Sequence, residues 1–227
     1  MNLLAIDTAA NLCAACVWDT EAGAERGRSV ADLGKGHAEF LIATIDAALK
    51  AAGCGYGDLG MLAAATGPGS FTGVRVGVAT LRGLALALKI PAAGVSTLDA
   101  IAAEAAAAHS GRKVLAAIDA GREELYVALY DELAKPIYGP VVTTHANALE
   151  IARRDDPVLA GSAARAIASG LAPLPAEIGP EAATADIATY ARIAAARGPA
   201  PQPPVPLYLR EPDAKPQAGF VLPRTRP

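Results

Sequence analysis

The sequence predicts an α/β fold built from two similar halves with a cleft between them. An apolar strand that ends in aspartate occurs twice, as Leu-Ala-Ile-Asp7 and as Ala-Ala-Ile-Asp119. In each half, two further predicted strands, a helix and another strand follow, which is the order expected of a duplicated α/β unit. The 227 residues are enough for one or two domains with a sizeable core.

The first half, residues 1–109, starts with three apolar or alternating segments that predict a strand meander. The helix that follows closes at a glycine, and a later one is stopped by proline. The predicted elements are strands Leu3–Asp7, Cys13–Trp18 and Glu25–Val30, a helix from Gly36-His37 to Ala52, strand Met61–Ala65, helix Val74–Leu88, strand Ala92–Val95 and a helix from Ser96-Thr97 to Ala108.

The second half, residues 110–198, begins at the break Ser110-Gly111. From Gly198 the chain is rich in proline, so residues 199–227 are predicted to form an extended tail. The elements expected between these points are strands Lys113–Asp119, Glu123–Tyr130 and Pro136–Thr143, a short helix around Leu149, strand Pro157–Ala160, a helix from Gly161-Ser162 to Ser169 and helix Thr184–Ala196.

Composition and charge argue against a membrane protein, a secreted protein and a protein that binds nucleic acid by itself. The chain has 20 Lys and Arg against 23 Asp and Glu, a net charge of −3. A protein that binds nucleic acid by itself usually presents a basic face, and no basic run is visible. No run of 18 or more apolar residues occurs, and the N-terminus lacks the basic region of a signal peptide. We therefore expect no membrane segment and a cytoplasmic location.

The cysteines and histidines do not form an obvious metal or redox site. Cys13 and Cys16 are three apart in a predicted strand, so their side chains should point to opposite faces and serve the core. His37 begins a helix, and a helical metal pair would need a second histidine four residues later, where Leu41 stands. No metal site is predicted, and no GxSxG elbow or hydrolytic triad is indicated.

The segment Thr66–Gly83, TGPGSFTGVRVGVATLRG, is a glycine-rich turn between a strand and a helix. Such turns bind phosphate or allow close packing. The lysine of a P-loop is missing, and the spacing GxGxxxG is one residue too long for a dinucleotide motif. Because Gly73 and Gly77 share a helix face, we favour a role in which another backbone packs closely against these glycines over a role in phosphate binding.

Two aspartates at strand ends leave two readings open. Asp7 and Asp119 could face the cleft of a duplicated fold and hold a metal or a phosphate-bound water. Alternatively, each starts a turn, as aspartate does by accepting a hydrogen bond from its own backbone.

The predicted helix from His37 to Ala52 is apolar on most of its sides, and the helix Val74–Leu88 also has little polar surface. If both cover one sheet, an apolar face of each is left over, and such a face usually marks an interface. The alternative is that the second half of the chain covers it.

Six segments resemble one known family in the same order along nearly the whole chain. They are Ile-Asp7-Thr8, Gly36-His37-Ala-Glu39, the 66–77 block TGPGSFTGVRVG, Gly94-Val-Ser-Thr-Leu98, Ala-Ile-Asp119-Ala and Tyr208-Leu-Arg210. These motifs resemble TsaB, also called YeaZ, a bacterial family of the actin, heat-shock ATPase and sugar kinase superfamily. The resemblance implies two ribonuclease H-like domains, 1–109 and 110–198, with a cleft between them, and a tail, 199–227.

The resemblance also implies a function. TsaB proteins pair with the related catalytic subunit TsaD; with TsaE and the product of TsaC, they add threonylcarbamoyl to the adenosine beside the anticodon of ANN-decoding tRNAs. A non-catalytic scaffold subunit is therefore expected, with a homodimer when TsaD is absent and tRNA contacted mainly through the complex. The alternative is a stand-alone ATPase or small-molecule kinase of the same superfamily.

The resemblance assigns two groups of residues and no catalytic ones. His37 and Leu41 stand where the catalytic relative has a His-x-x-x-His metal pair, so no metal and no resident cofactor are expected. The nucleotide site looks degenerate, with weak binding at most; its candidates are Asp7, Thr8, Asp119, Gly121, Gly161 and Ser162. The predicted partner interface comprises His37, Phe40, Leu41, Thr44, Ile45, Ser70, Phe71, Gly73, Val74, Gly77 and Thr80.

Overall fold

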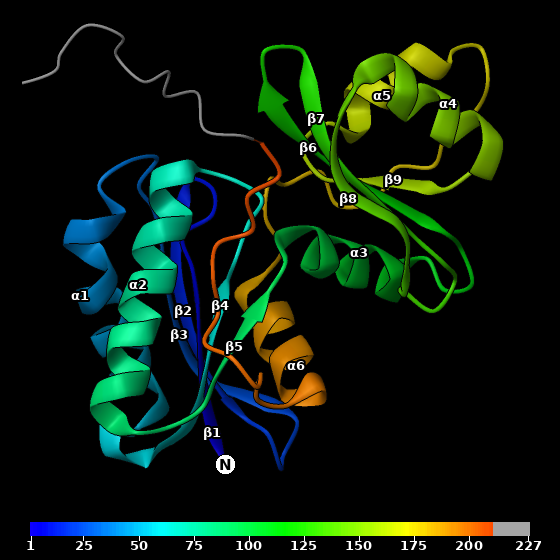
Figure 1. Ribbon diagram of the computed structural model, residues 1–227. Coiled ribbons are helices and arrows are strands. Elements are labelled where there is room, and N and C mark those ends of the chain that lie inside the picture. The colour runs from blue at the N-terminus through cyan, green and yellow to red at the C-terminus, as the bar shows by residue number, and fades with distance from the viewer. Residues whose placement is uncertain (211–227) are drawn as a thin grey trace, which may run out of the picture.

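Two β-sheets with helices packed around them form the protein in a computed structural model that describes residues 1–210 (Figure 1). The first sheet has the strand order β3-β2-β1-β4-β5, and the second has the order β8-β7-β6-β9. Each sheet combines an antiparallel meander with parallel strands. The predicted α/β fold with two similar halves is therefore confirmed.

The first sheet is built around strands that are buried on both faces. In β1, Leu3 and Ala5 belong to one hydrophobic cluster while Leu4 and Ile6 belong to another on the opposite face. This explains the unbroken apolar run, since side chains alternate along a strand. The elements of this half are β1 Asn2–Asp7, β2 Leu12–Asp19, β3 Ala24–Asp32, α1 His37–Ala52, the 3-10 turn Tyr56–Asp58, β4 Leu59–Ala65, α2 Phe71–Leu88, β5 Ala92–Val95 and α3 Thr97–Ala108.

The second sheet repeats the pattern with fewer strands. β6 pairs antiparallel with β7 and parallel with β9. Helices α4 and α5 bury Ile151 and Ile167 against its outer face. The elements are β6 Val114–Gly121, β7 Glu124–Tyr130, β8 Pro136–Thr144, α4 His145–Asp155, β9 Val158–Ala160, α5 Ala164–Leu171 and α6 Ile187–Arg197.

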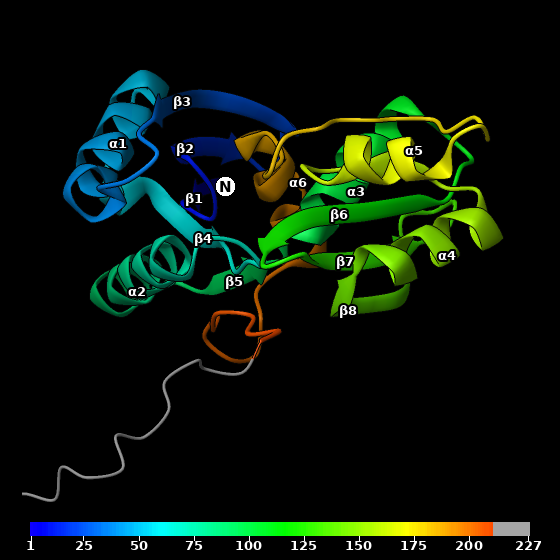
Figure 2. The same ribbon diagram turned by 90° about the horizontal axis from the view of Figure 1, so that it is seen from above.

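Helices α3 and α6 lie between the two sheets (Figure 2). α3 packs against β6, β7 and β9, whereas α6 packs against β1, β2, β4 and β5 of the first sheet. The last helix of the predicted second half thus covers the sheet of the first. It begins at Ile187 rather than at Thr184, because Asp186 caps it by accepting a hydrogen bond from the backbone N–H of Ala188 at 2.9 Å.

The predicted placement of the cysteines is confirmed. Cys13 is buried in the cluster beneath α1, and Cys16 is buried in the cluster on the other face, beside α6. Burial raises the pKa of the Cys16 thiol to about 12, so this thiol stays protonated at neutral pH.

The described part of the proline-rich segment, residues 199–210, packs along the first half. The backbone N–H of Leu207 donates to the carbonyl oxygen of Thr66 at 2.8 Å, and that of Ala200 donates to the carbonyl of Ala92 at 3.4 Å. The predicted tail beyond residue 210 lies outside the described residues. Within residues 1–210, one helix, α2, has the length and apolar composition of a membrane span, a property it shares with core helices of soluble proteins.

Candidate functional site

The glycine-rich turn between β4 and α2 is occupied by contacts within the chain. The backbone N–H of Ser70 donates to the carbonyl oxygen of Ala9 at 2.6 Å, and the N–H of Thr97 donates to the carbonyl of Gly67 at 2.8 Å. Ser70 caps α2 by accepting from the N–H of Gly73 at 3.2 Å, so the helix starts at Phe71, three residues earlier than predicted. The turn thus joins the helix start to the loop after β1.

Gly73 and Gly77 lie on the buried face of α2, against Thr8. A Cβ atom on Gly73 would overlap the carbonyl oxygen of Thr8, and one on Gly77 would lie 2.5 Å from the Thr8 hydroxyl oxygen. The same hydroxyl donates to the carbonyl of Gly73 at 2.7 Å. The predicted close approach of another backbone to Gly73 and Gly77 is therefore correct, but that backbone is the Thr8 loop of this same chain. The assignment of these glycines to a partner interface was wrong.

Most of the predicted interface residues face inward. Leu41 and Ile45 lie on the inner side of α1, which packs against β2 and β3. The Thr44 hydroxyl on the same helix lies 3.6 Å from the sulfur of Cys13. A sheet buries one side of an adjacent helix, and the periodicity did not show which side that is. Buried are His37, Leu41, Thr44, Ile45, Gly73, Val74 and Gly77; exposed or half-buried are Phe40, Ser70, Phe71 and Thr80.

The outer sides of α1 and α2 expose small and apolar residues. Phe40 is 48% exposed, and Ala43 and Ala79 are also exposed. We call this surface the α1–α2 face, and it consists of Phe40, Ala43 and Ala47 of α1 with Thr72, Val76, Ala79, Thr80, Gly83 and Ala87 of α2. Sequence analysis missed its alanines, because an alanine is equally common on the buried and the exposed side of a helix.

Asp7 belongs to a buried hydrogen-bond chain. One oxygen of its carboxyl group accepts from the N–H of Ala9 at 2.8 Å, and the other accepts from the hydroxyl of Thr184 at 2.5 Å. That hydroxyl lies 2.6 Å from the hydroxyl of Tyr190 on α6. Burial raises the pKa of Asp7, although the bond from Thr184 opposes the shift, and burial raises the pKa of Tyr190 far above its usual value.

These buried hydrogen bonds favour the interpretation that Asp7 starts a turn, because the bond from the N–H of Ala9 to its carboxyl group closes a local turn. Both Asp7 and Thr8 are 1% exposed. His37 is also buried, and its Nε2 has no hydrogen-bond partner among residues 1–210. No group of three His, Cys, Asp or Glu residues suited to a metal ion occurs in the same range.

The four candidates of the second half gather at the carboxyl end of β6. Asp119 is exposed; its carboxylate accepts from the N–H of Gly121 at 2.7 Å, and its own N–H donates to the Ser162 hydroxyl at 3.1 Å. Gly161 has a φ of +95°, and a Cβ there would overlap the carbonyl of Ala117. The structure thus brings these four candidates together, with Asp119, Gly121 and Ser162 exposed and Gly161 buried.

A cluster that sequence analysis missed lies at the start of α2. The Nε of Arg75 donates to the hydroxyl of Tyr208 at 2.8 Å, and its guanidinium carbon lies 3.5 Å from the ring centre of Phe71. The two aromatic ring centres are 6.1 Å apart. Tyr208 is 133 residues from Arg75 in sequence, so no local pattern could indicate this contact.

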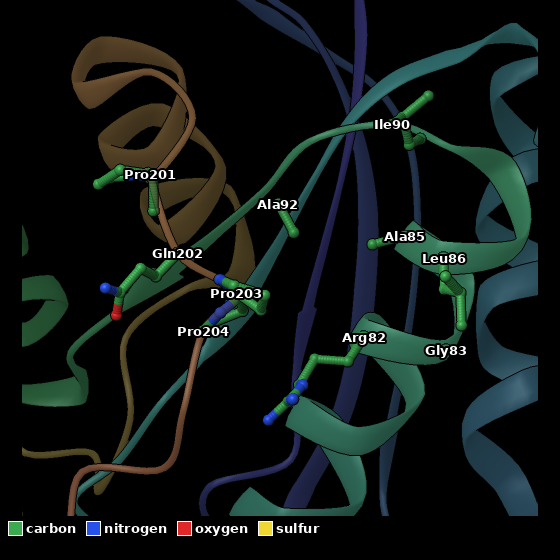
Figure 3. Close-up of a pocket in the computed structure, with 11 residues that line it drawn as sticks. Arg82, Gly83, Ala85, Leu86, Ile90, Ala92, Pro201, Gln202, Pro203 and Pro204 are labelled. Atoms are coloured by element: carbon green, nitrogen blue, oxygen red, sulfur yellow. The ribbon is translucent and has the colours of Figure 1, made fainter.

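A groove of about 550 Å³ runs beside the second half of α2 (Figure 3). Its opposite wall is the proline-rich segment at residues 200–204, and Arg82 points from α2 toward Pro203 and Pro204. Ala85, Ile90 and Ala92 add apolar surface to the groove.

Comparisons with known proteins agree with the motifs. The family model of TsaD, tRNA N6-adenosine threonylcarbamoyltransferase, matches residues 31–199. The TsaB protein of Escherichia coli is 38% identical over 131 residues, 57% of this chain and 55% of the relative. An uncharacterized protein of Mycobacterium tuberculosis is 34% identical over 217 residues, 96% of this chain and 95% of its own. The chain spans about half the length of these relatives named TsaB, from Escherichia coli and Haemophilus influenzae.

Two solved structures from Pseudomonas aeruginosa share the fold across 92% of this chain and 99% of theirs. One is YeaZ, with a TM-score of 0.72 and 27% identity. The other is described as an uncharacterized protein with similarity to peptidase YeaZ, with a TM-score of 0.75 and 26% identity.

The contact between α2 and Thr8 gives a prediction for stability. Gly73→Ala should lower the free energy of unfolding by about 1–3 kcal/mol, because the added Cβ overlaps a backbone oxygen that cannot move freely. Gly83→Ala on the same helix meets nothing within 4 Å and should raise it by up to about 1 kcal/mol. Urea unfolding measures both, and equal effects would contradict the packing described.

The raised pKa of Asp7 gives a prediction for pH. Its contribution to stability is fully present below the ordinary value of 3.8 and is lost as the pH rises through the higher folded pKa. Compared with Asp7→Asn, the wild type should therefore become progressively less stable as the pH rises from 3.8. Urea unfolding across a pH series measures the difference.

Asp19 supplies the control of opposite sign. Hydrogen bonds from the backbone of Ala22 and Glu21 lower its pKa. Compared with Asp19→Asn, the wild type should gain stability as the pH rises from acid toward 3.8. If the stability difference between wild type and variant changed with pH in the same direction for Asp7→Asn and Asp19→Asn, the raised pKa of Asp7 would be wrong.

Proposed function

The chain belongs to the TsaB (YeaZ) group of the threonylcarbamoyltransferase family, and on that basis we propose that it is the non-catalytic subunit of the complex that adds threonylcarbamoyl to tRNA. It pairs with TsaD through the α1–α2 face, joins TsaE in a larger complex, and forms a homodimer when TsaD is absent. The modified residue is the adenosine beside the anticodon of ANN-decoding tRNAs. The protein acts in the cytoplasm and contacts tRNA mainly through the complex.

The observation that carries this proposal is the α1–α2 face. The two helices lie side by side on the first sheet, and their outer sides expose small and apolar residues (Figure 1). Small residues let helices from another protein approach closely, and an apolar patch with few charges is typical of the core of an interface. A pair of helices from the related subunit would complete a four-helix bundle on this face.

The non-catalytic assignment is supported by the state of the two strand-end aspartates. Asp7 is enclosed by Thr184 and Ala9, so it offers no free carboxylate to a metal or a phosphate. Asp119 is exposed, but it has no matching acidic partner from the first half. We therefore propose that the chain uses no resident cofactor and that any weak nucleotide binding occurs at the carboxyl end of β6.

The second candidate function is a stand-alone ATPase or small-molecule kinase. It is favoured by the cluster of Asp119, Gly121, Gly161 and Ser162, which lies where the family resemblance places a phosphate-binding hairpin. A kinase of this superfamily would use carboxylates from both halves of the cleft, and Asp7 is buried. The scaffold function is therefore the better supported of the two.

Pairing with TsaD provides the first test. Ala43→Glu and Ala79→Glu place a charge on exposed positions of the α1–α2 face and should weaken pairing at least 10-fold, because the carboxylate would be buried without a partner. Ala166→Glu on α5 makes the same change on an exposed position elsewhere and should pair as the wild type does. Co-expression, size-exclusion chromatography and binding titration give the readout.

Three results would count against this assignment. The first is a wild type that does not associate with TsaD. The second is an Ala43→Glu, Ala79→Glu double variant that pairs normally. The third is tRNA modification by TsaD and the other components that proceeds equally well when this chain is left out.

Nucleotide turnover provides the second test. The purified chain alone should show no ATP hydrolysis above background, and any weak ATP binding should be lost in Asp119→Ala and kept in Asp7→Asn, since Asp7 is sealed from solvent. Calorimetry and a phosphate-release assay measure both. Turnover by the chain alone that depends on Asp119 would replace the scaffold function with the ATPase function.

A further inference from the structure

One edge of α2 carries positive charges. Arg75 and Arg82 are seven residues apart, so they lie about 10.5 Å apart along one side of the helix, and Lys89 follows as the left-handed residue that ends it. All three are exposed, and residues 71–89 contain no Asp or Glu. In a chain with a net charge of −3, this edge is a local concentration of positive charge.

The cations of this row are not neutralised within the chain. Among residues 1–210, the side chains of Arg82 and Lys89 make no hydrogen bond or ion pair, and Arg75 bonds only through Nε, to Tyr208. Two exposed arginines elsewhere are paired, Arg165 with Glu181 and Arg28 with Asp186. The row therefore keeps its bonding capacity for something outside the chain.

Exposed aromatic rings adjoin the row. Phe71 is 58% exposed and Tyr208 is 55% exposed, and Arg75 is held between them, 3.5 Å from one ring centre and 5.3 Å from the other. The contact fixes the guanidinium, so less side-chain freedom is lost when its two terminal nitrogens bind an oxyanion. Farther along, the groove beside Arg82 is lined by the exposed Pro203 and the buried Pro204.

This basic edge is separate from the α1–α2 face. α1 lies on one side of α2 and the proline-rich segment on another, in both views (Figures 1 and 2). Val76 and Leu84 pack toward the α1 cluster, whereas Arg82 points toward the proline-rich segment. A partner bound to the α1–α2 face would leave the basic edge at the margin of the interface, open to a third molecule.

We propose that the basic edge of α2, with Phe71, Tyr208 and the groove at Pro203 and Pro204, is a contact surface for a single-stranded loop of RNA. Exposed cations beside exposed aromatic rings suit a phosphodiester strand with unstacked bases, because the cations bind phosphates and the aromatic rings stack on bases. An acidic protein segment would use the charges but would leave the stacked Phe71, Arg75 and Tyr208 unexplained. The inference rests on the proposed function, which makes the anticodon loop of tRNA the RNA concerned.

The basic edge should contribute only a small part of the affinity for tRNA, and the size of that part can be calculated. Three cations contact at most three phosphates, so most of the affinity for tRNA comes from the rest of the complex. Each single-strand phosphate contact adds about 0.7 to the slope of log affinity against log salt. Removing two contacts should therefore reduce the magnitude of that slope by about 1.4.

The test uses the complex with TsaD and an unmodified ANN-decoding tRNA transcript, titrated by fluorescence anisotropy at several salt concentrations. Arg82→Glu with Lys89→Glu should weaken tRNA binding about 5- to 20-fold near physiological salt and reduce the salt slope. Lys35→Glu with Arg192→Glu makes the same charge change at exposed positions elsewhere and should have little effect. Phe71→Leu should weaken binding several-fold without changing the slope, because stacking releases no counterions.

Each outcome decides between the alternatives. Size-exclusion chromatography of the wild type with TsaD first tests the proposed function by itself. If pairing fails there, the same titrations on the chain alone at low salt still test the basic edge. The Arg82→Glu, Lys89→Glu variant could instead pair less well with TsaD, while the fraction that still pairs binds tRNA as the wild-type complex does. That result would make this edge a protein-docking surface and not an RNA contact. Equal tRNA affinity and salt slope in the charge variant and its control would overturn the proposal.

Discussion

The contact of Gly73 and Gly77 with Thr8 determines how α2 is turned about its own axis. With no side chain at these two positions, the helix backbone rests directly on the loop after β1, and the Thr8 hydroxyl donates to the carbonyl of Gly73. A helix held this closely cannot rotate without a steric clash. The outward positions of α2 then follow from its 3.6-residue period: one edge is small and apolar, and the other carries Arg75 and Arg82. Both proposed surfaces depend on this orientation.

The buried bonds of Asp7 join parts of the chain that are far apart in sequence. Asp7 ends the central strand of the first sheet, while Thr184 and Tyr190 come after the whole second sheet. Through them, α6 is anchored on the first sheet, and the ion pair of Arg28 with Asp186 holds the start of the same helix from the edge strand β3. A carboxylate that could face a cleft serves instead to fix the returning chain. A strand-end aspartate is thus evidence for chemistry only where its oxygens remain free.

The sequence predicted the architecture well and the surfaces poorly, for identifiable reasons. Apolar runs such as Met61–Ala65 identify strands buried on both sides, and the positions of Cys13 and Cys16 follow from strand alternation alone. Long-range contacts leave no such pattern. The packing of α6 on the first sheet and of Tyr208 on Arg75 depends on the path of the chain between distant segments. The alanine-rich helices also lack a periodic contrast, so Leu41 and Ile45 were assigned to the surface although they belong to the core.

The division of α2 into two unlike edges bears on how a scaffold could influence a reaction that it does not perform. An apolar edge favours a lasting contact, since it excludes water over a continuous area, whereas a row of exposed cations favours rapid and salt-sensitive contact. Under the proposed function, a catalytic subunit and a nucleic acid would therefore be bound on one rigid helix without competing for the same side chains. Because both contacts share that helix, the distance between them is set by the fold and not by a linker. Positioning of this kind raises the rate of a reaction by fixing geometry, with no catalytic group required from the positioning chain.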